Sequence, residues 1–157
     1  KATISDAKLI HDIQVESFLP LLDKYKDYDT NPANEPIEKV QTRLNNTRSS
    51  FYKIMVNHNV VGAIRIIQGE SSNDWWVSPM FILPSFQGKG IAQKVMLMME
   101  DITPEATTWN LATILEEERN CYLYEKLGFE KTGEQKIINE FTTLVYYKKV
   151  TKRFIRR

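Results

Sequence analysis

Residues 84–92 read Pro84-Ser85-Phe86-Gln87-Gly88-Lys89-Gly90-Ile91-Ala92 and separate two stretches of different hydrophobic period. The stretch before them, Trp75 to Leu83, is apolar over most of its length, which predicts a strand in the middle of a sheet. The stretch after Gly90 places apolar residues along one helical face. These positions are Ile91, Val95, Met99 and Ile102. The segment therefore predicts a tight turn from a buried strand into an amphipathic helix.

The composition of this turn favours an anion-binding site. Gly88 and Gly90 let the backbone approach a ligand closely, and Lys89 adds a positive charge. The first N–H groups of a helix have no partner within the helix, and with the helix dipole they suit a phosphate. Neither nucleotide fingerprint fits, because GxxxxGK[ST] is absent and Gln93 stands at the third glycine of a dinucleotide-binding turn. A glycine-rich turn that binds nothing is the alternative interpretation.

Two helices and three strands are predicted upstream. The first helix begins after Ser5, a common N-cap residue, and Pro20 is expected to break or kink it. Polar residues 27–35 predict a loop, and Pro36 suits the first turn of the second helix. Pro79 in the third strand predicts a bulge there or just after it. The strands are Phe51–Val56, Val60–Ile67 and Trp75–Leu83.

Downstream, the pattern predicts a strand, a short helix and a closing hairpin. The ranges are Thr107–Leu115, Glu116–Leu127, Phe129–Ile138 and Glu140–Val150. Gly128 is well placed to follow the end of the short helix. The order of elements is roughly ααβββαβαββ, with no repeat and no linker, so we expect one α/β or α+β domain.

The predicted short helix carries a second group of polar residues. Asn120 and Tyr124 are four residues apart and share one helical face. A tyrosine hydroxyl beside a cleft could donate a proton to a reacting group, and packing within an amphipathic helix is the alternative. Cys121 is interpreted as a small packing residue rather than a nucleophile.

The composition limits the classes of function. The 157 residues include 21 Lys and Arg against 20 Asp and Glu, so the net charge of +1 gives no broad positive surface for nucleic acid. Cys121 has no cysteine partner, and two histidines make no metal-ligand cluster stand out. We see neither a signal sequence nor a spanning stretch, so we expect a cytoplasmic domain with no membrane partner. Residues 151–157 predict a basic, solvated tail, with contact to an anionic surface as the alternative.

The two motifs and the order of elements resemble the GCN5-related N-acetyltransferase (GNAT) superfamily. The spacing Gln87-x-x-Gly90-x-Ala92 matches that family's pyrophosphate-binding pattern, Gln/Arg-x-x-Gly-x-Gly/Ala. The run from Asn120 to Phe129, which ends Tyr-Glu-Lys-Leu-Gly-Phe, is similar to its downstream motif. The resemblance implies a single acetyltransferase domain over residues 1–150.

The resemblance also implies a mixed, curved sheet with helices on both faces and a V-shaped cleft between its fourth and fifth strands. Those strands would be Trp75–Leu83 and Thr107–Leu115, counted after a short strand near residues 2–4. Acetyl-CoA would lie in the cleft as cosubstrate, without a metal. The first strand of the cleft would pair with the pantetheine arm, and the turn would hold the pyrophosphate. The implied cofactor-binding residues are Phe81, Ile82, Leu83, Gln87, Gly88, Lys89, Gly90, Ile91, Ala92 and Asn120.

The implied reaction is direct attack of an amine on the thioester in a ternary complex. Tyr124 would protonate the departing thiolate, and an N–H near Ile82 would stabilise the oxyanion. Glu116 is the first candidate for a base or water relay, and a solvated surface carboxylate is the alternative. Acidic and aromatic groups near the cleft would suit a cationic amine. The candidates for acceptor binding are Tyr28, Glu35 and Trp75.

The sequence thus predicts an N-acetyltransferase that acts on a primary amine of a small molecule or a peptide. The alternative is a non-catalytic module of the same fold that binds acyl-CoA as a sensor or partner domain. Homodimers are common in the family, so self-association is a further expectation.

Overall fold

The computed structural model describes residues 1–151, and its helices and strands follow the predicted order. The helices are α1 (Ala7–Tyr25), α2 (Ile37–Asn45), α3 (Ile91–Ile102) and α4 (Glu118–Lys126). The strands are β1 (Ser49–Val56), β2 (Asn59–Gln68), β3 (Asp74–Ile82), β4 (Thr108–Ile114), β5 (Glu130–Asn139) and β6 (Thr142–Val150). Short 3-10 turns lie at Ile4–Asp6, Pro32–Asn34 and Pro84–Phe86.

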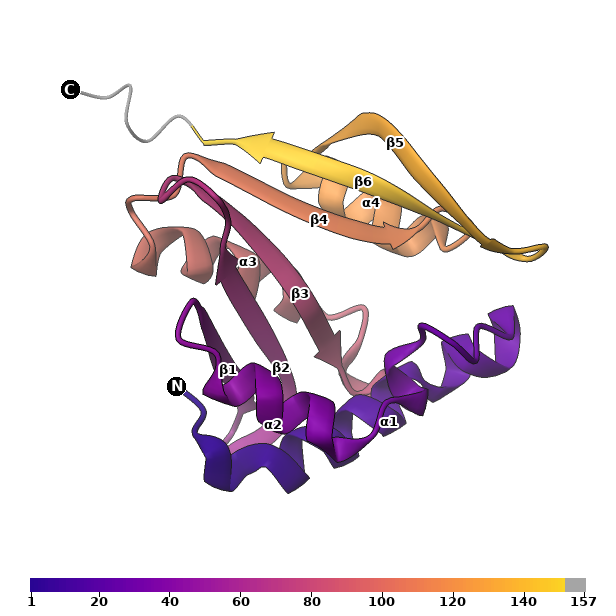
Figure 1. The fold of residues 1–157 in the computed structure, drawn as a ribbon, viewed down its shortest axis with the longest axis horizontal. Coiled ribbons are helices and arrows are strands. Elements are labelled where there is room, and N and C mark those ends of the chain that lie inside the picture. The colour runs from indigo at the N-terminus through magenta and orange to yellow at the C-terminus, as the bar shows by residue number, and fades with distance from the viewer. Residues whose placement is uncertain (152–157) are drawn as a thin grey trace.

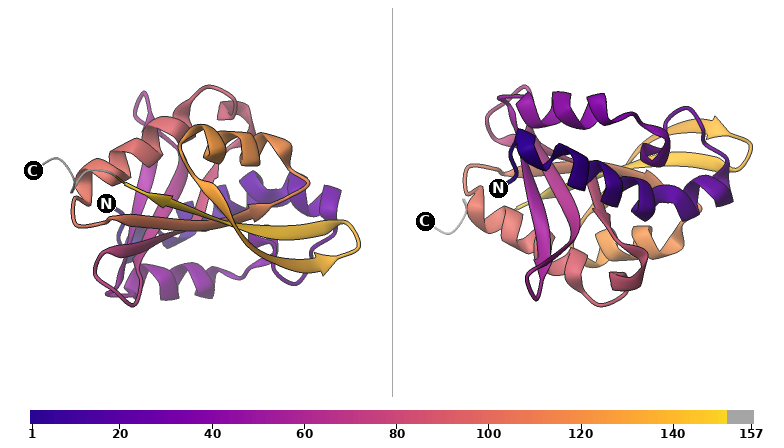
Figure 2. Two further views of the ribbon diagram at one scale, coloured as in Figure 1. Left: turned by 90° about the horizontal axis from the view of Figure 1, so that it is seen from above. Right: turned by 90° about the horizontal axis from the view of Figure 1, so that it is seen from below.

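The strands form one curved sheet in the order β1-β2-β3-β4-β6-β5 (Figure 1). Neighbouring strands are antiparallel except β3 and β4, which run parallel. Helices α1 and α2 cover one face of the sheet, and α3 and α4 cover the other (Figure 2). The mixed sheet with helices on both faces is the predicted architecture.

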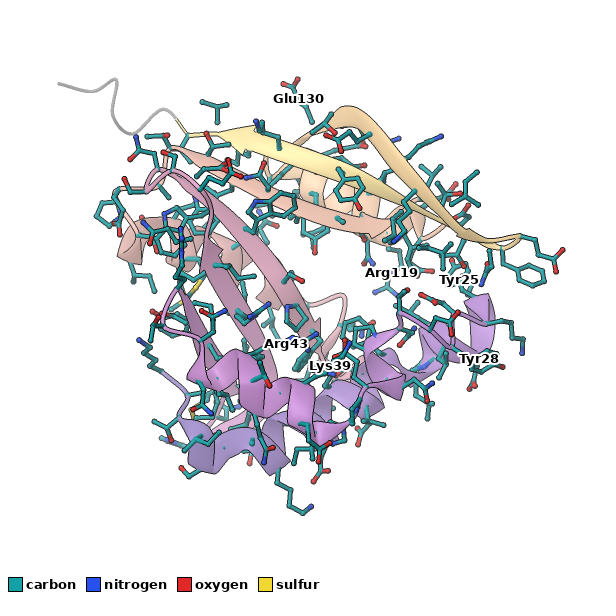
Figure 3. The ribbon with its side chains drawn as sticks, viewed as in Figure 1. Tyr25, Tyr28, Lys39, Arg43, Arg119 and Glu130 are labelled. Atoms are coloured by element: carbon teal, nitrogen blue, oxygen red, sulfur yellow. The ribbon has the colours of Figure 1, made fainter. Side chains whose placement is uncertain are left out.

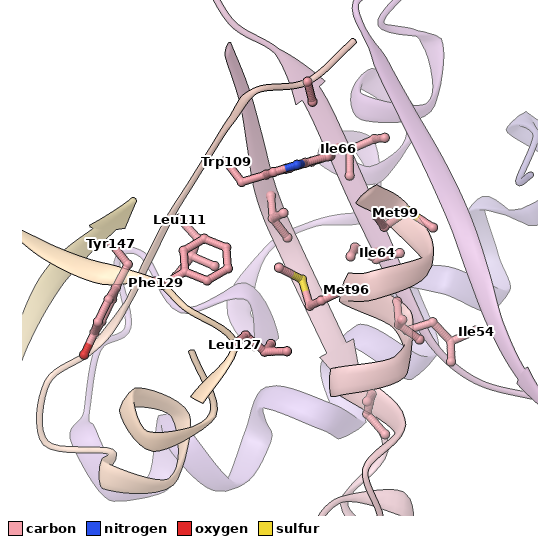
Figure 4. Packing of buried hydrophobic residues seen from close by; sticks show 14 of the residues in the cluster. Ile54, Ile64, Ile66, Met96, Met99, Trp109, Leu111, Leu127, Phe129 and Tyr147 are labelled. Atoms are coloured by element: carbon pink, nitrogen blue, oxygen red, sulfur yellow. The ribbon is translucent and has the colours of Figure 1, made fainter. Parts of the chain in front are cut away.

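Each face of the sheet has its own hydrophobic core. The core under α3 and α4 contains Trp109, which is 1% exposed, together with Met96 and Tyr147 (Figure 4). The core under α1 and α2 contains Phe81, whose ring meets Phe18 of α1 edge to face at 5.8 Å. Burial of each such large side chain contributes about 1.5–3 kcal/mol, so β3 is held on both faces.

Strands β3 and β4 pair at one end only. The pairs run from Asp74 with Thr108 to Trp76 with Asn110, and beyond them the strands diverge (Figure 1). The Asn110 side chain marks this point, because its amide donates to the Asp74 carboxylate at 2.7 Å and to the Trp75 carbonyl at 2.9 Å. This V-shaped opening is the predicted cleft.

An irregularity in β3 helps to turn it away from β4. Ser78 and Pro79 together lie opposite Arg65 of β2, between the regular pairs Ile66–Val77 and Ile64–Met80. An extra residue on one strand bends that strand and increases its twist. The bulge predicted for the region after Pro79 is therefore present and begins at Ser78.

Near the N-terminus, the expected short strand is wrong, and the break that was one of the two outcomes expected at Pro20 is absent. No strand forms at residues 2–4: the Thr3 N–H donates to the Asp6 carboxylate at 2.9 Å, and this capping turns the chain directly into a helix. The cleft strands are consequently the third and fourth of the chain. Helix α1 also continues through Pro20 without a break.

The last described residue, Thr151, is held in the packed domain by a hydrogen bond. Thr151 is buried, and its N–H donates to the Thr107 carbonyl at 2.9 Å, so the packed domain extends one residue past the predicted boundary. The rest of the predicted basic tail, residues 152–157, lies outside the described residues. Within residues 1–151, none of the helices has the length and apolarity that crossing a membrane requires.

Candidate functional site

A cleft of about 580 Å³ lies where β3 and β4 diverge. One wall is the face of α1 that carries Ser17, Leu21 and Lys24. The opposite wall is the segment from Glu117 through α4, and the turn between β3 and α3 closes the remaining side. Figure 3 shows the α1 side and the α4 side facing each other across this space. The predicted turn and the predicted helix therefore meet at one site.

The turn before α3 presents unpaired backbone donors. Gly88 and Gly90 have φ of +75° and +80°, a backbone region that side chains disfavour, which explains the glycines at both positions. Within the described residues, the N–H groups of residues 88–93 have no hydrogen-bond acceptor. Gln87 closes the turn, since its side-chain amide donates to the Ile82 carbonyl at 2.9 Å. Such a row of amides at a helix N-terminus suits a phosphate.

The free edge of β3 supplies further backbone groups. The Leu83 N–H donates to the Val61 carbonyl at 2.8 Å, and the Leu83 carbonyl accepts from Phe86. Because groups on an antiparallel strand alternate in direction, Met80 and Ile82 face the edge that β4 has left. The amides of Phe81 and Leu83 therefore point toward β2. From the sequence, Phe81, Ile82 and Leu83 were instead all expected to face the pantetheine arm.

Arg119 was not identified from the sequence and lies next to the turn. A Cβ placed on Gly88 would be 3.5 Å from an Nη atom of Arg119. The side chain is exposed, and within the described residues it forms neither an ion pair nor a hydrogen bond. Figure 3 shows it reaching from the α4 side toward the gap. A planar guanidinium here can bind phosphate oxygens in a bidentate manner.

Tyr124 lines the cleft from α4, as does Asn120 one turn earlier. Its ring packs edge to face on Phe129 at 5.9 Å, which fixes its direction. Burial and, to a lesser extent, the nearby Cys121 raise the pKa of Tyr124 to about 12. The hydroxyl therefore carries its proton at neutral pH and can donate it.

The two neighbouring carboxylates at the end of β4 have different partners. Glu116 is exposed, accepts a hydrogen bond from the Thr143 N–H at 2.8 Å, and does not line the cleft. The Glu117 side chain is 17% exposed and lines the cleft. It accepts from the Tyr25 hydroxyl at 2.6 Å and from the Lys24 ammonium at 3.2 Å. The carboxylate that lines the cleft is therefore Glu117, one residue after Glu116, the candidate suggested by the sequence.

The three candidates for acceptor binding lie outside the cleft lining. Tyr28 is exposed in the loop after α1, where Figure 3 shows it away from the α4 side. Trp75 lies where β3 and β4 are still paired, and its Nε1 donates to the Ser72 carbonyl at 3.0 Å. Glu35 forms a bidentate ion pair with Arg43 at 2.6 and 2.8 Å, which joins the 27–35 loop to α2.

The ion pair of Glu35 predicts a stability effect that depends on pH. Burial raises the pKa of Glu35, but hydrogen bonds and charge from Arg43 outweigh it and lower the pKa below 4.5. A lowered folded-state pKa stabilises the fold above the unfolded-state pKa, and this stabilisation is lost as the pH falls through the folded-state value. We expect Glu35→Gln to lower the free energy of unfolding by about 1–3 kcal/mol at neutral pH.

Urea unfolding of the wild type and the variant at pH about 7 and about 3 checks this effect. The difference should shrink at the lower pH, because protonation of Glu35 in the wild type removes the ion pair as the pH falls. Glu38→Gln, which changes an exposed carboxylate of α2, is the control. A difference of equal size at both pH values would contradict the assignment.

Metal chemistry has no candidate ligands in the part of the chain that the structure describes, where no group of three His, Cys, Asp or Glu side chains is arranged to hold an ion.

Ser17 of α1 is a further polar group of the cleft to which no role has been assigned. Its hydroxyl is buried and has no hydrogen-bond partner among residues 1–151. A bound ligand could supply that partner.

Comparisons with known proteins agree with the fold. A family model described as an acetyltransferase (GNAT) domain matches residues 22–150. None of the curated proteins matches the sequence. An acetyltransferase from Thermus thermophilus has a TM-score of 0.73 and 15% sequence identity, over 96% of this chain and 94% of that chain.

Two other solved structures are similar over almost the whole chain. One is a spermidine N-acetyltransferase SpeG chimera from Vibrio cholerae and hSSAT, with a TM-score of 0.73 and 16% identity over 99% of this chain and 97% of that chain. The other is AAC(6')-Ib in complex with ribostamycin and coenzyme A, with a TM-score of 0.71 and 17% identity over 99% and 93%. At these identities the likeness shows the shared fold.

Proposed function

The chain belongs to the acetyltransferase (GNAT) family, and on this premise we propose that its cleft binds acetyl-CoA and transfers the acetyl group to the primary amine of a cationic acceptor. The observation that carries the proposal is the row of unpaired amides at residues 88–93, which opens onto the same cleft that Tyr124 lines. A phosphate-binding turn and a proton donor that line one cleft are what a phosphate-bearing thioester requires.

The residues of the cleft support contacts with the pyrophosphate and the pantetheine arm of this cofactor. The pyrophosphate would lie against the amides of residues 88–93, with Arg119 beside it. Lys89, also expected here from the sequence, does not line this cleft, and its ammonium lies 5.6 Å from the Phe86 ring centroid. The pantetheine arm would run along the β3 edge, where Met80 and Ile82 offer the groups that β4 does not use. Asn120 would hydrogen-bond the arm from α4.

The reaction then follows from the groups around the thioester. The acceptor enters as an ammonium, and Glu117 receives its proton, directly or through water, because only the neutral amine attacks. The new N–C bond forms as the carbonyl oxygen gains charge, which the Ile82 N–H would stabilise. The C–S bond breaks, Tyr124 gives its proton to the CoA thiolate, and the proton that the nitrogen loses as the amide forms returns to the Tyr124 oxygen, directly or through water. Holding both substrates in one cleft supplies much of the rate.

Glu117 and Glu116 provide a matched pair of variants. We expect Glu117→Gln to reduce kcat/KM about tenfold, because an amide cannot take the proton and only water remains. Glu116→Gln should leave kcat/KM unchanged, since the glutamine oxygen can still accept the Thr143 N–H. Steady-state kinetics with saturating acetyl-CoA measures both. Equal losses in the two variants would contradict the role of Glu117.

The experiment that tests the function is a screen of amines for release of the free CoA thiol from acetyl-CoA. Cationic acceptors are the first choice, because Glu117 is the carboxylate that lines the cleft and because structural neighbours include a spermidine acetyltransferase and an enzyme solved with ribostamycin. Amine-dependent thiol release supports the enzyme. Binding of acetyl-CoA without release for any amine would favour the alternative, a non-catalytic acyl-CoA-binding module.

A further inference from the structure

We propose that Lys24 occupies the ammonium subsite of this enzyme, so that an acceptor must displace the enzyme's own lysine from Glu117 to bind. The inference rests on the proposed function, since it concerns the acceptor half of the same cleft. It assigns the substrate class as well: a strongly basic alkyl amine, which carries a positive charge at neutral pH as the lysine does.

The geometry around Glu117 is that of a site for an ammonium ion. Its carboxylate is mostly buried, and a buried carboxylate requires a cation or several donors. Lys24 provides the cation at 3.2 Å, and the Tyr25 hydroxyl donates at 2.6 Å. Both residues come from the last turn of α1, and Glu117 comes from the facing segment that leads into α4.

The two partners of Glu117 differ in how firmly they are held. The Tyr25 carbonyl accepts from Asn139 at 2.9 Å and from Thr142 at 3.3 Å, so the hairpin of β5 and β6 fixes this end of α1. Figure 3 shows Tyr25 at the end of the gap, near Arg119. Lys24 instead has a long side chain that is 61% exposed, and its ammonium lies 5.1 Å from the Tyr25 ring centroid. Tyr25 is thus the fixed wall of the subsite, and Lys24 is the exchangeable occupant.

An arriving alkylammonium can reproduce every contact that Lys24 makes. It can donate to the Glu117 carboxylate and lie over the Tyr25 ring, while Lys24 swings into solvent at little cost. Hydrogen bonding with Tyr25 and then with Glu117 raises the pKa of Lys24, so the lysine is charged and competes at neutral pH. A weakly basic aromatic amine, neutral at this pH, has no charge with which to displace it.

The test is Lys24→Met, which removes the competing charge and keeps an unbranched, helix-favouring side chain. For a straight-chain alkyl amine we expect KM to fall about two- to fivefold with kcat unchanged, the size expected for an exposed ion pair. Lys24→Arg, which keeps the competing charge, should show no fall in KM. An unchanged or increased KM in Lys24→Met would overturn the proposal, because Lys24 would then be either irrelevant or part of the acceptor site.

Lys8→Met is the matched control. It removes the same charge and an exposed ion pair, with Asp12, from the opposite end of the same helix, and it should leave KM unchanged. A fall in KM in both variants would assign the effect to net charge and overturn the inference. The failure of the proposed function is distinguishable, because wild-type enzyme would then release no CoA thiol with any amine.

Discussion

Gly90→Glu is expected to weaken acetyl-CoA binding about 100-fold while the protein remains folded. Gly90 is the N-cap of α3, and a Cβ at this position would have open space around it. The new carboxylate would lie among the amides that are proposed to hold the pyrophosphate. A charge about 5 Å from a phosphate, at an effective dielectric constant of about 20, costs roughly 3 kcal/mol, which corresponds to about 100-fold in Kd.

The matched control is Gly90→Gln, which has the same size and the same backbone strain at φ of +80° but no charge. Calorimetric titration with acetyl-CoA should show a loss of about tenfold or less in this variant, and circular dichroism should show that both are folded. If the Glu and Gln variants bind acetyl-CoA equally, the phosphate does not lie at this turn.

Tyr124→Phe is expected to lower kcat about 100-fold with the Kd for acetyl-CoA unchanged. The hydroxyl is protonated at neutral pH because the pKa of Tyr124 is raised to about 12, so its removal leaves the CoA thiolate without a donor. The ring contact with Phe129 survives in the variant, which keeps the wall of the cleft intact. Single-turnover kinetics and calorimetry measure the two quantities separately.

Tyr28→Phe, which alters an exposed tyrosine outside the cleft lining, is the control and should keep full activity. The raised pKa gives a second check on the assignment. The pH profile of kcat should show no alkaline fall from Tyr124 below pH about 10, because the group remains protonated there. Full activity of Tyr124→Phe would contradict its role as general acid.

The turn before α3 and the cleft face of α4 were predictable because their signals are local. Glycine is favoured where φ is positive, as at Gly88 and Gly90, and the change from an apolar run to helical spacing marks the turn. The same is true of Tyr124, which lies four residues after Asn120 on a helix. These features depend on neighbours in the sequence, so spacing alone locates them.

The contacts of Glu117 were not predictable, because they join distant segments. Glu117 meets Tyr25, which lies 92 residues earlier, and nothing local separates Glu117 from Glu116 at a point where the period changes from two to 3.6. Pro20 has a local cost of about 3 kcal/mol in a helix. The contacts at the end of α1 with Glu117, Asn139 and Thr142 offset that cost, so the helix continues.

The most direct test of the central claim is an NMR titration of the wild-type protein with acetyl-CoA, observed through its backbone amides. We predict saturable binding in the micromolar range, with the largest shifts at residues 88–93 and further shifts at Ile82 and Asn120. Shifts confined to another surface, or none at millimolar acetyl-CoA, would contradict the account.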